Sequence, residues 1–259
     1  MAPTVATAKD YVRELAIPEA EPSVLAEKVA AIDFAFDTAR EQASVVGSDV
    51  IAFVKGITPE QRTDIVNAML LAQLAAKKKM PEPKDLEGVR EWFKSYFDVL
   101  SNIGFVGQEL TFAKYEEKAE TFEAHQAILD VAKMFLAGAP GALAIVEKTL
   151  TSLQKMDEDS PWITIFHRES RSGTVARFQV GMAEVDEKEG LLVRLMAFGL
   201  QADARITQVL FFKFRKNKAS LEQSSGKATI DAPVLASVRM DIAKKIGEHV
   251  KSFVAGIEI

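Results

Sequence analysis

Residues 190–214, GLLVRLMAFGLQADARITQVLFFKF, decide the fold class of this chain. They contain two strongly apolar runs of strand length, and a short polar turn separates them. The first run is apolar on both faces apart from Arg194, which predicts a central strand that is covered on both sides. Because the chain before residue 157 has mainly the pattern of amphipathic helices, the sequence predicts helices packed on a small sheet.

Helical spacing and capping signals predict helices over most of residues 23–157. The clearest start is Thr58-Pro59-Glu60-Gln61, where Thr58 caps the helix and Gln61 closes a capping box. Three lysines end this helix and complement the negative end of its dipole. The expected helices cover Ser23–Val46, a shorter segment ending at Gly56, residues 59–79, an aromatic segment around Trp92–Leu100, Thr121–Ala137 and Ala142–Met156. Residues 104–117 are expected to form a strand inserted between helices.

The sheet is expected in residues 161–231. Its strands are WITIFHRES (162–170), TVARFQVGMAEV (174–185), GLLVRLMAFGL (190–200), RITQVLFFKFRK (205–216) and SLEQSSGKATI (220–230). Short polar links between consecutive strands indicate antiparallel pairing. A closing helix over 232–255, capped by Asp231, returns an apolar stripe to the core. The predicted class is therefore α+β: a helical N-terminal two-thirds on a mainly antiparallel sheet of four or five strands, closed by a long C-terminal helix.

The predicted domain organisation is a single domain with a flexible arm. Pro18 and Pro22 interrupt residues 1–22, which are expected to form the arm. Residues 23–259 are expected to form one α+β domain, with a helical part at 23–157, a sheet part at 161–231 and the closing helix. Removal of that helix would expose its long apolar stripe, which argues against separate domains.

Composition excludes several kinds of site. The 259 residues include no cysteine, so thiol catalysis, disulfides, thiolate metal sites and S-acylation are ruled out. A net charge of −5 argues against a nucleic-acid partner, since phosphate binding needs a basic surface. The longest apolar run without a charge, Ala68–Ala76, is too short to cross a bilayer, and the N-terminus lacks the pattern of a signal peptide. A soluble protein, cytoplasmic as made, is expected, with export by a non-classical route as the alternative.

No catalytic motif stands out. The three histidines, His125, His167 and His249, do not have the spacing of metal ligands on one helix face, and no cofactor is expected. No G-x-S-x-G, G-x-x-x-x-G-K-[ST] or G-x-G-x-x-G pattern occurs. His167 lies beside Glu169 and Ser170, so a hydrolase or transferase with a dispersed site around His167 is kept as an alternative. The favoured interpretation is a protein that is not an enzyme.

Positive charge is concentrated after the second apolar run. Residues 205–227 contain six basic residues and a single acidic residue, Glu222. An anionic membrane attracts such a segment by about 1 kcal/mol per basic residue. An apolar hairpin with a basic tip is therefore predicted to bind anionic lipid. The alternative is that these lysines only protect strand edges from aggregation. The predicted lipid or membrane surface consists of Arg205, Lys213, Arg215, Lys216, Lys218 and Lys227.

The order of segments resembles the Evf-type bacterial virulence factors. The resemblance covers most of residues 23–255. Its first part is a helix with Trp92, Tyr96, Val99 and Leu100 that ends in Asn102-Ile103-Gly104 and is followed by the extended FVGQELTFAKYE. Its second part is the apolar hairpins and the capped final helix from Asp231 to Phe253. It implies an α/β protein that is lipid-associated and linked to virulence. In that family a buried cysteine carries a fatty acyl chain. This chain has no cysteine, so the acylation and its site residue do not carry over.

The function expected from the sequence is therefore a non-enzymatic bacterial virulence or toxin-associated protein that acts at or near host membranes. If the protein binds lipid, its partner is expected to be anionic lipid. If it is a component of a multi-protein toxin, its partners are expected to be other toxin subunits. An intracellular hydrolase or transferase, and an interaction module of a larger assembly, are the alternatives. The oligomeric state does not follow from the sequence.

Overall fold

The computed structural model describes residues 3–20, 34–107, 111–116, 121–157, 159–207, 209, 213–215 and 218–259. A mixed sheet, nine-stranded in this described part, has the order β11-β1-β2-β7-β8-β10-β3, with β4 also on β10 and β6 on β7. The strands are β1 (Gln42–Val46), β2 (Asp49–Phe53), β3 (Phe105–Val106), β4 (Ala113–Lys114), β6 (Arg171–Ser172), β7 (Val175–Asp186), β8 (Gly190–Ala202), β10 (Ala219–Ile230) and β11 (Val254–Glu258). The predicted α+β class is confirmed, although the sheet is larger than expected.

The β7–β8 hairpin forms the centre of the sheet. Its long antiparallel register runs from Val175 opposite Gln201 to Asp186 opposite Gly190. Nearly all of the apolar side chains of these two strands are buried. Since neighbouring side chains on a strand point to opposite faces, both faces of the hairpin have to be covered. The parallel pair β2–β7 joins it to the β1–β2 hairpin.

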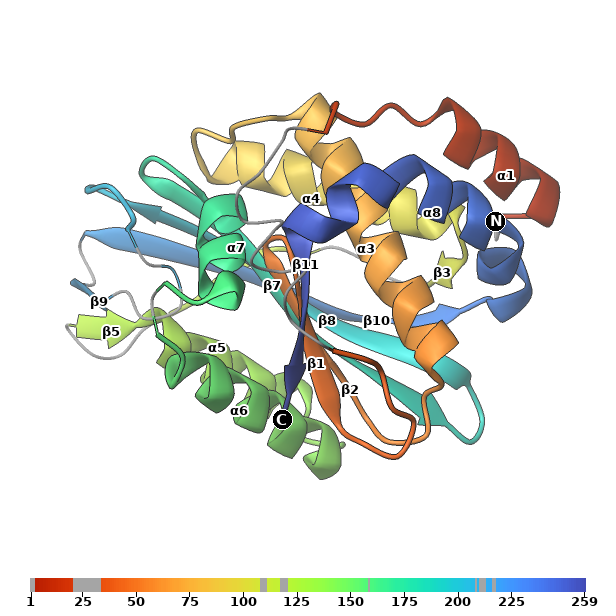
Figure 1. Cartoon of the computed structure of the whole chain (residues 1–259). Helices are drawn as coiled ribbons and strands as arrows, with labels where there is room; N and C mark the ends of the chain where they lie inside the picture. Colours follow the sequence, from red (N-terminus) through yellow and green to blue (C-terminus); the bar gives the residue numbers. More distant parts are fainter. Residues whose placement is uncertain are drawn as a thin grey trace.

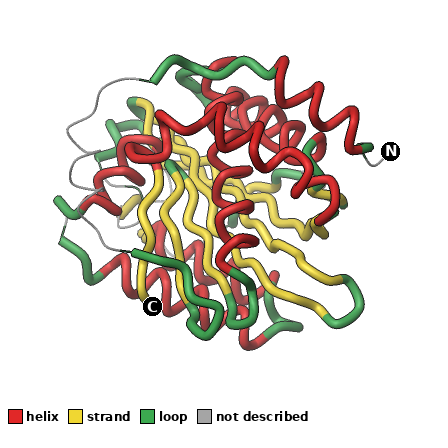
Figure 2. The backbone as a smooth tube through the Cα atoms, turned by 45° about the vertical axis from the view of Figure 1, so that its right-hand side comes forward, coloured by secondary structure: helices red, strands yellow, loops and turns green. Residues whose placement is uncertain are grey.

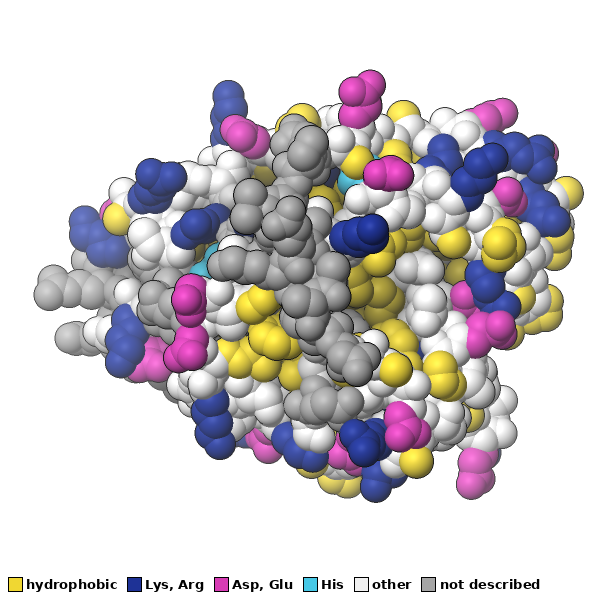
Figure 3. All heavy atoms as spheres, in the orientation of Figure 1, with side chains coloured by type: hydrophobic (Ala, Val, Ile, Leu, Met, Phe, Trp, Pro, Cys, Tyr) yellow, Lys and Arg dark blue, Asp and Glu magenta, His cyan; other side chains and the backbone are white. Residues whose placement is uncertain are grey.

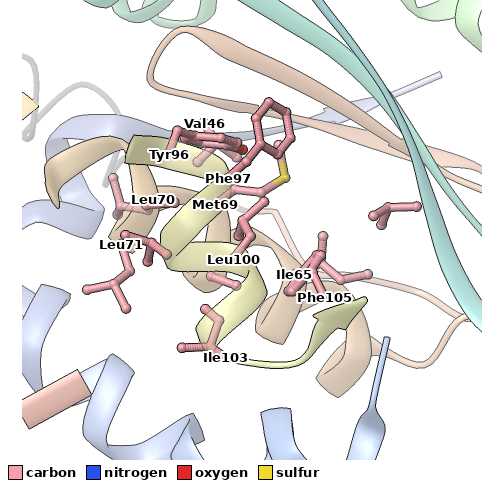
Figure 4. Packing of buried hydrophobic residues seen from close by; sticks show 14 of the residues in the cluster. Val46, Ile65, Met69, Leu70, Leu71, Tyr96, Phe97, Leu100, Ile103 and Phe105 are labelled. Carbon is pink, nitrogen blue, oxygen red and sulfur yellow. The ribbon is translucent and has the colours of Figure 1, made fainter. Parts of the chain in front are cut away.

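Helices on one face are α1 (Val5–Glu14), α3 (Pro59–Lys79), α4 (Leu86–Asn102) and α8 (Ala232–Phe253). Figure 1 shows this layer above the sheet. Buried apolar residues of α3 and α4 form most of the core beneath it. Figure 4 shows part of this packing, with side chains of both helices grouped together: Ile65, Met69, Leu70, Leu71, Tyr96, Phe97 and Leu100.

Helices on the opposite face are α5 (Ala124–Phe135), α6 (Pro140–Gln154) and α7 (Pro161–Ser170). Their apolar side chains form a second core with the other face of β7 and β8. Phe178 of β7 stacks on Phe198 of β8 with a centroid distance of 5.0 Å, and Phe166 of α7 contacts Phe178 at 6.1 Å. Figure 2 shows the strands between the two helical layers.

Several helices begin where the sequence predicted. Thr58 and Gln61 form the expected capping box of α3, with Pro59 at its first position. Asp231 accepts a hydrogen bond from the amide of Val234 and so caps α8. These local signals determine the helix starts because each satisfies amide groups that the helix itself leaves without partners.

The helices expected at 23–46 and before Gly56 are wrong where the structure describes them. Gln42–Val46 and Asp49–Phe53 form the β1–β2 hairpin instead, and residues 23–33 lie outside the described part. The two runs are five residues long, rich in β-branched residues, and joined at Gly47, whose φ is +55°. A two-residue turn with positive φ favours a hairpin, because its twist matches that of the strands.

The strands expected at 162–170 and 205–216 are also corrected. Residues 161–170 form α7, which Ser160 caps and Pro161 begins. The strand that pairs with β8 after the turn is β10, so the predicted basic hairpin does not form. Of residues 205–216, Lys213–Arg215 form the short strand β9, which pairs with β5 (Thr121–Glu123) in a separate two-stranded sheet. Ile206 and Val209 are buried in the second core.

Both ends of the described chain pack on the domain. Within the arm predicted over residues 1–22, α1 buries Ala8 and Val12 against the first core. Lys245 of α8 donates to the carbonyl of Leu15 at 2.7 Å, which fixes the end of α1. After α8, the strand β11 pairs with β1. Among the described residues, no helix is both long enough and apolar enough to cross a membrane.

Replacement of Phe178 by alanine tests the central packing. Phe178 is fully buried between Phe166 and Phe198. We expect Phe178→Ala to lower the free energy of unfolding by about 3–5 kcal/mol, because a cavity replaces the ring. Urea unfolding measures the change. Val185→Ala in the same strand is the control, since Val185 is 53% exposed and should change stability by less than about 0.5 kcal/mol. An equal loss in both variants would contradict the assigned core.

Candidate functional site

The strongest candidate site is a cavity of about 270 Å³ where the last turns of α3, α7 and α8 meet. Figure 1 shows these three helix ends close together. A larger depression of about 370 Å³ beside Arg40, Lys55 and Lys148 is lined mostly by exposed side chains and is less enclosed. The cavity is lined by Pro18, Glu19, Ala20, Leu74, Lys77, Arg168, Glu169, Glu248, His249, Ser252 and Phe253.

Glu169 organises the charges in the wall of the cavity. Its side chain is only 6% exposed, and its two carboxylate oxygens accept from Lys77 Nζ at 2.9 Å and from Arg168 Nε at 2.6 Å. Arg168 also donates through Nη2 to the carbonyl of Ser252 at 2.7 Å. These bonds connect the ends of α3, α7 and α8. A buried carboxylate with two charge-assisted partners has a fixed orientation, so this wall is preorganised.

Phe253 provides the aromatic surface of the cavity. Lys77 Nζ lies 5.4 Å and Arg168 Cζ lies 5.0 Å from the centre of its ring. Both distances are in the range of cation–π attraction. The ring of His249 contacts Phe253 edge to face, with a centroid distance of 5.9 Å. The two cations that bind Glu169 therefore also hold this ring in place.

His249 is buried and uncharged at neutral pH. Desolvation by burial lowers its pKa below the usual 6.5, and Lys77 acts in the same direction. A hydrogen bond to the backbone of Pro18 and the charge of Glu248 oppose the shift. A neutral imidazole has one N–H donor and one acceptor nitrogen, so His249 can offer an acceptor to a ligand in the cavity.

Ser252 contributes a polar group without a partner. The residue is 6% exposed and lines the cavity one turn after His249. Within the described part of the chain, its hydroxyl forms no hydrogen bond. Because Ser252 lines the cavity, its hydroxyl can form a hydrogen bond with a polar group there.

A second polar cluster lies beneath α4, at the parallel pair β2–β7. The carboxylate of Asp49 accepts from Tyr96 Oη at 2.9 Å and from Gln179 Nε2 at 3.4 Å. Burial raises the pKa of Asp49 to about 7, although Tyr96 and the charge of Arg177 lower it. Tyr96 has a pKa well above its ordinary value of 10, chiefly through burial and then through the charge of Asp49.

Arg177 interacts electrostatically with the carboxylates of both sites, Glu169 and Asp49. Its guanidinium stacks on Trp92 at 4.2 Å from the ring centre. Burial lowers its pKa to about 10, whereas the charges of Glu169 and Asp49 raise it. Its Nε has no hydrogen-bond partner in the described part of the structure. Arg177 therefore connects the cavity wall to the Asp49 cluster electrostatically.

Three of the predicted lipid-binding lysines form ion pairs in the described part of the structure. Lys213 pairs with Glu123 at 2.8 Å, and Lys218 pairs with Asp203 at 3.4 Å. Lys227 pairs with Glu189 at 2.6 Å and lies toward the other end of β10 from Lys218. Arg205 is exposed in the connection after β8, Arg215 belongs to β9, and Lys216 lies outside the described residues. Figure 3 shows lysine and arginine side chains dispersed over the face it displays.

The Ser-His-Glu arrangement considered around His167 is not assembled. His167, Glu169 and Ser170 are buried in the last turn of α7. The hydroxyl of Ser170 has no partner among the described residues, and the carboxylate of Glu169 binds Lys77 and Arg168. Without a hydrogen bond from serine to a base, the hydroxyl is not activated as a nucleophile. In the described part of the chain, no three histidine, aspartate or glutamate side chains are placed to hold a metal.

Sequence reasoning missed the cavity because its residues come from separate helices. Lys77 and Glu169, for example, are 92 positions apart. The only local signals were the lysines that end α3 and the acidic neighbour of His167. Neither signal indicates that three helix ends meet, because that depends on how the helices cover the sheet.

The solved structures that resemble this fold include a delta-endotoxin and an Evf virulence factor, and both likenesses are weak. No protein-family model matches the chain, and no curated protein matches it. A solved structure described as a delta-endotoxin has a TM-score of 0.36 and 13% identity, over 86% of this chain and 95% of that one. A structure of the Evf virulence factor has a TM-score of 0.34 and 11% identity, over 88% and 87%. The resemblance predicted from the sequence is thus met only as a general pattern.

Replacement of Asp49 by asparagine tests the buried cluster. The pKa of Asp49 is about 7 in the folded protein, against an ordinary value of 3.8. The stability that this raised pKa contributes is therefore complete below about pH 4 and is lost as the pH rises to 7. Since each pKa unit corresponds to about 1.36 kcal/mol, the loss is on the order of 4 kcal/mol.

An asparagine side chain at this position would carry no charge and would still accept from Tyr96. The variant Asp49→Asn should therefore be more stable than the native chain at pH 8 and nearly equal to it at pH 4. Urea unfolding at intervals from pH 4 to pH 8 measures this difference. The exposed Asp159→Asn is the control, for which we expect no such trend. A stability difference for Asp49→Asn that does not vary with pH would contradict the buried, protonated carboxyl.

Proposed function

We propose that this chain is a non-catalytic binding protein whose ligand is a small organic molecule held between the ends of α3, α7 and α8. The observation that carries this proposal is the cavity of about 270 Å³, which combines apolar and aromatic walls with a few polar groups. Ligand sites in proteins commonly have this composition. Pockets that hold drug-sized ligands have about 300–1,000 Å³. The cavity is slightly smaller than this range, so a fragment-sized ligand is expected to fit it.

The rigidity of the wall supports binding. Lys77 and Arg168 are held by Glu169, and both lie on the ring of Phe253. Their side chains lose little further freedom when a ligand enters, so the entropic cost of ordering them is already met in the free protein. A preorganised wall of this kind favours recognition of a particular shape.

The chemistry of the cavity supports binding more than catalysis. Ser252 lies one turn from the neutral His249, yet its hydroxyl has no hydrogen bond in the described part of the structure. Glu169 is neutralised by two cations and is not placed as a general base. Nucleophilic catalysis needs a nucleophile that a neighbouring base activates.

A fragment-sized probe tests the proposal. We expect 3-phenyl-1-propanol to bind with a dissociation constant on the order of millimolar, because its roughly ten heavy atoms contribute about 0.3–0.4 kcal/mol each. Chemical-shift perturbation in ¹H–¹⁵N NMR spectra should locate it at Lys77, Glu169 and Ser252. Phe253→Leu should weaken binding at least threefold, because it removes the aromatic wall.

Phe135→Leu is the matched control for this variant. Phe135 is also a partly buried helical phenylalanine, but it packs in the core on the opposite face of the sheet. Its replacement should leave the affinity for 3-phenyl-1-propanol unchanged. Perturbations that avoid the cavity, or equal losses in both variants, would reject the site.

Membrane docking by the connection between β8 and β10 is a second candidate function. Arg205, Lys213 and Lys218 of this connection are exposed, and Arg215 lies in β9 between them. Exposed basic residues in one connection are attracted to anionic lipid, although Glu123 and Asp203 offset part of the charge. Such binding would be consistent with a role in virulence, or as part of a toxin, at host membranes. The support for this role is the pattern of the sequence.

Vesicle co-sedimentation tests membrane docking. We expect the protein to sediment with phosphatidylserine vesicles at low salt, to be released at moderate salt, and not to bind phosphatidylcholine vesicles. The combined variant Lys213→Glu, Arg215→Glu, Lys216→Glu and Lys218→Glu should lose this binding while it keeps its circular dichroism spectrum. Lys227→Glu, toward the other end of β10, is the control and should retain binding. Unchanged sedimentation of the combined variant would exclude the β8–β10 connection as the docking element.

A further inference from the structure

We infer that the cavity between α3, α7 and α8 selects a small organic cation, an ammonium group on an apolar body. This inference rests on the proposed binding function and specifies the class of its ligand. It is carried by the helix ends that surround the cavity, by the charges in its wall and at its mouth, and by acceptors that have no partner.

Three helix C-termini converge on the cavity. Lys77 belongs to the last turn of α3, Arg168 and Glu169 to the last turn of α7, and Ser252 and Phe253 to the last turn of α8. Each helix C-terminus carries about half a negative charge, which in α8 is reduced by the bonds from Arg168 to the carbonyl of Ser252 and from the amide of Gly47 to the carbonyl of Phe253. Their combined field favours positive charge in the space between them.

The cations of the wall are already engaged. Glu169 binds both Lys77 and Arg168, and Arg168 also binds the carbonyl of Ser252. An anionic ligand would have to compete with a carboxylate that is 6% exposed and bonded at 2.6 and 2.9 Å. Such short charge-assisted bonds are stronger than bonds between neutral groups, so their exchange for a ligand anion is unfavourable.

The mouth of the cavity carries negative charge. Glu19 and Glu248 both line it, and both are exposed. With Glu169, the lining has three carboxylates against the two cations Lys77 and Arg168. His249 does not restore the balance, because burial lowers its pKa and leaves it neutral.

Two buried groups match the donors of an ammonium. His249 lines the cavity, and its neutral ring has one acceptor nitrogen. Ser252, which is 6% exposed, has a hydroxyl that is unpartnered within the described structure. An ammonium group has three donors and no acceptor, so it can satisfy both. Leu74 and Phe253 then offer surface to the apolar body of the ligand.

Three probes of nearly equal shape separate charge from shape: 3-phenylpropylamine, 3-phenyl-1-propanol and 3-phenylpropionate. Dissociation constants are measured by NMR titration at about pH 7.5, where the amine is a cation and the acid an anion. We expect the amine to bind at least threefold more tightly than the alcohol, and the propionate to bind most weakly. High salt should reduce the advantage of the amine, because Glu19 and Glu248 are exposed to solvent.

The variant Glu248→Gln keeps the shape of the mouth and removes one charge. It should weaken binding of the amine roughly two- to fivefold and leave the alcohol unchanged. Glu187→Gln, in the exposed turn between β7 and β8, is the control and should change neither. Equal binding of all three probes, or tightest binding of the propionate, would overturn the inference while the proposed binding function stands. Failure of all three probes to bind would overturn the proposed function itself.

Discussion

Both faces of the β7–β8 hairpin are apolar, and the rest of the structure depends on covering them. The exposure of either face would place a row of Val, Leu, Met and Phe side chains in water, at a cost of about 1.5–3 kcal/mol for each large side chain. Two helical layers meet this demand, with α3, α4 and α8 on one face and α5, α6 and α7 on the other. The ends of α3 and α8 from one layer meet the end of α7 from the other at the bonds of Lys77 with Glu169 and of Arg168 with Ser252, and the cavity lies there.

One cluster of buried polar residues lies inside this apolar frame, beside the parallel pair β2–β7. Asp49, Gln179 and Tyr96 form hydrogen bonds with one another there, and Arg177 interacts electrostatically with Asp49 and Glu169. A buried charge is tolerated only where another charge or hydrogen bonds compensate it. The cavity wall therefore depends electrostatically on residues of the sheet core, since Arg177 interacts with the same carboxylate that orients Lys77 and Arg168.

Short sequence patterns correctly predicted features of the structure that depend only on neighbouring residues. The capping box of Thr58 and Gln61 and the cap at Asp231 placed α3 and α8, and alternation placed β7. Residues 42–46 and 49–53 were wrongly predicted as parts of two helices because Gly47 also suits the end of a helix, whereas it turns the chain between two strands. Residues 162–170 were likewise wrongly predicted as a strand, although Ser160 and Pro161 are the start signals of the helix α7. Pairings such as β1 with β11 depend on the whole fold and have no local signature.

Closeness in sequence and closeness in space also differ for the charged residues. The cations of residues 205–227 are close in sequence, but in space Lys213, Lys218 and Lys227 each pair with an acid of a different segment. In the cavity, by contrast, Lys77 and Glu169 are remote in sequence and bonded in space. An exposed pair contributes little free energy and is easily screened, whereas a buried carboxylate with two cations is held in one geometry. Electrostatic selectivity in this protein is therefore expected where a buried carboxylate orders its partners, at the meeting of the helix ends, more than where basic residues are most numerous.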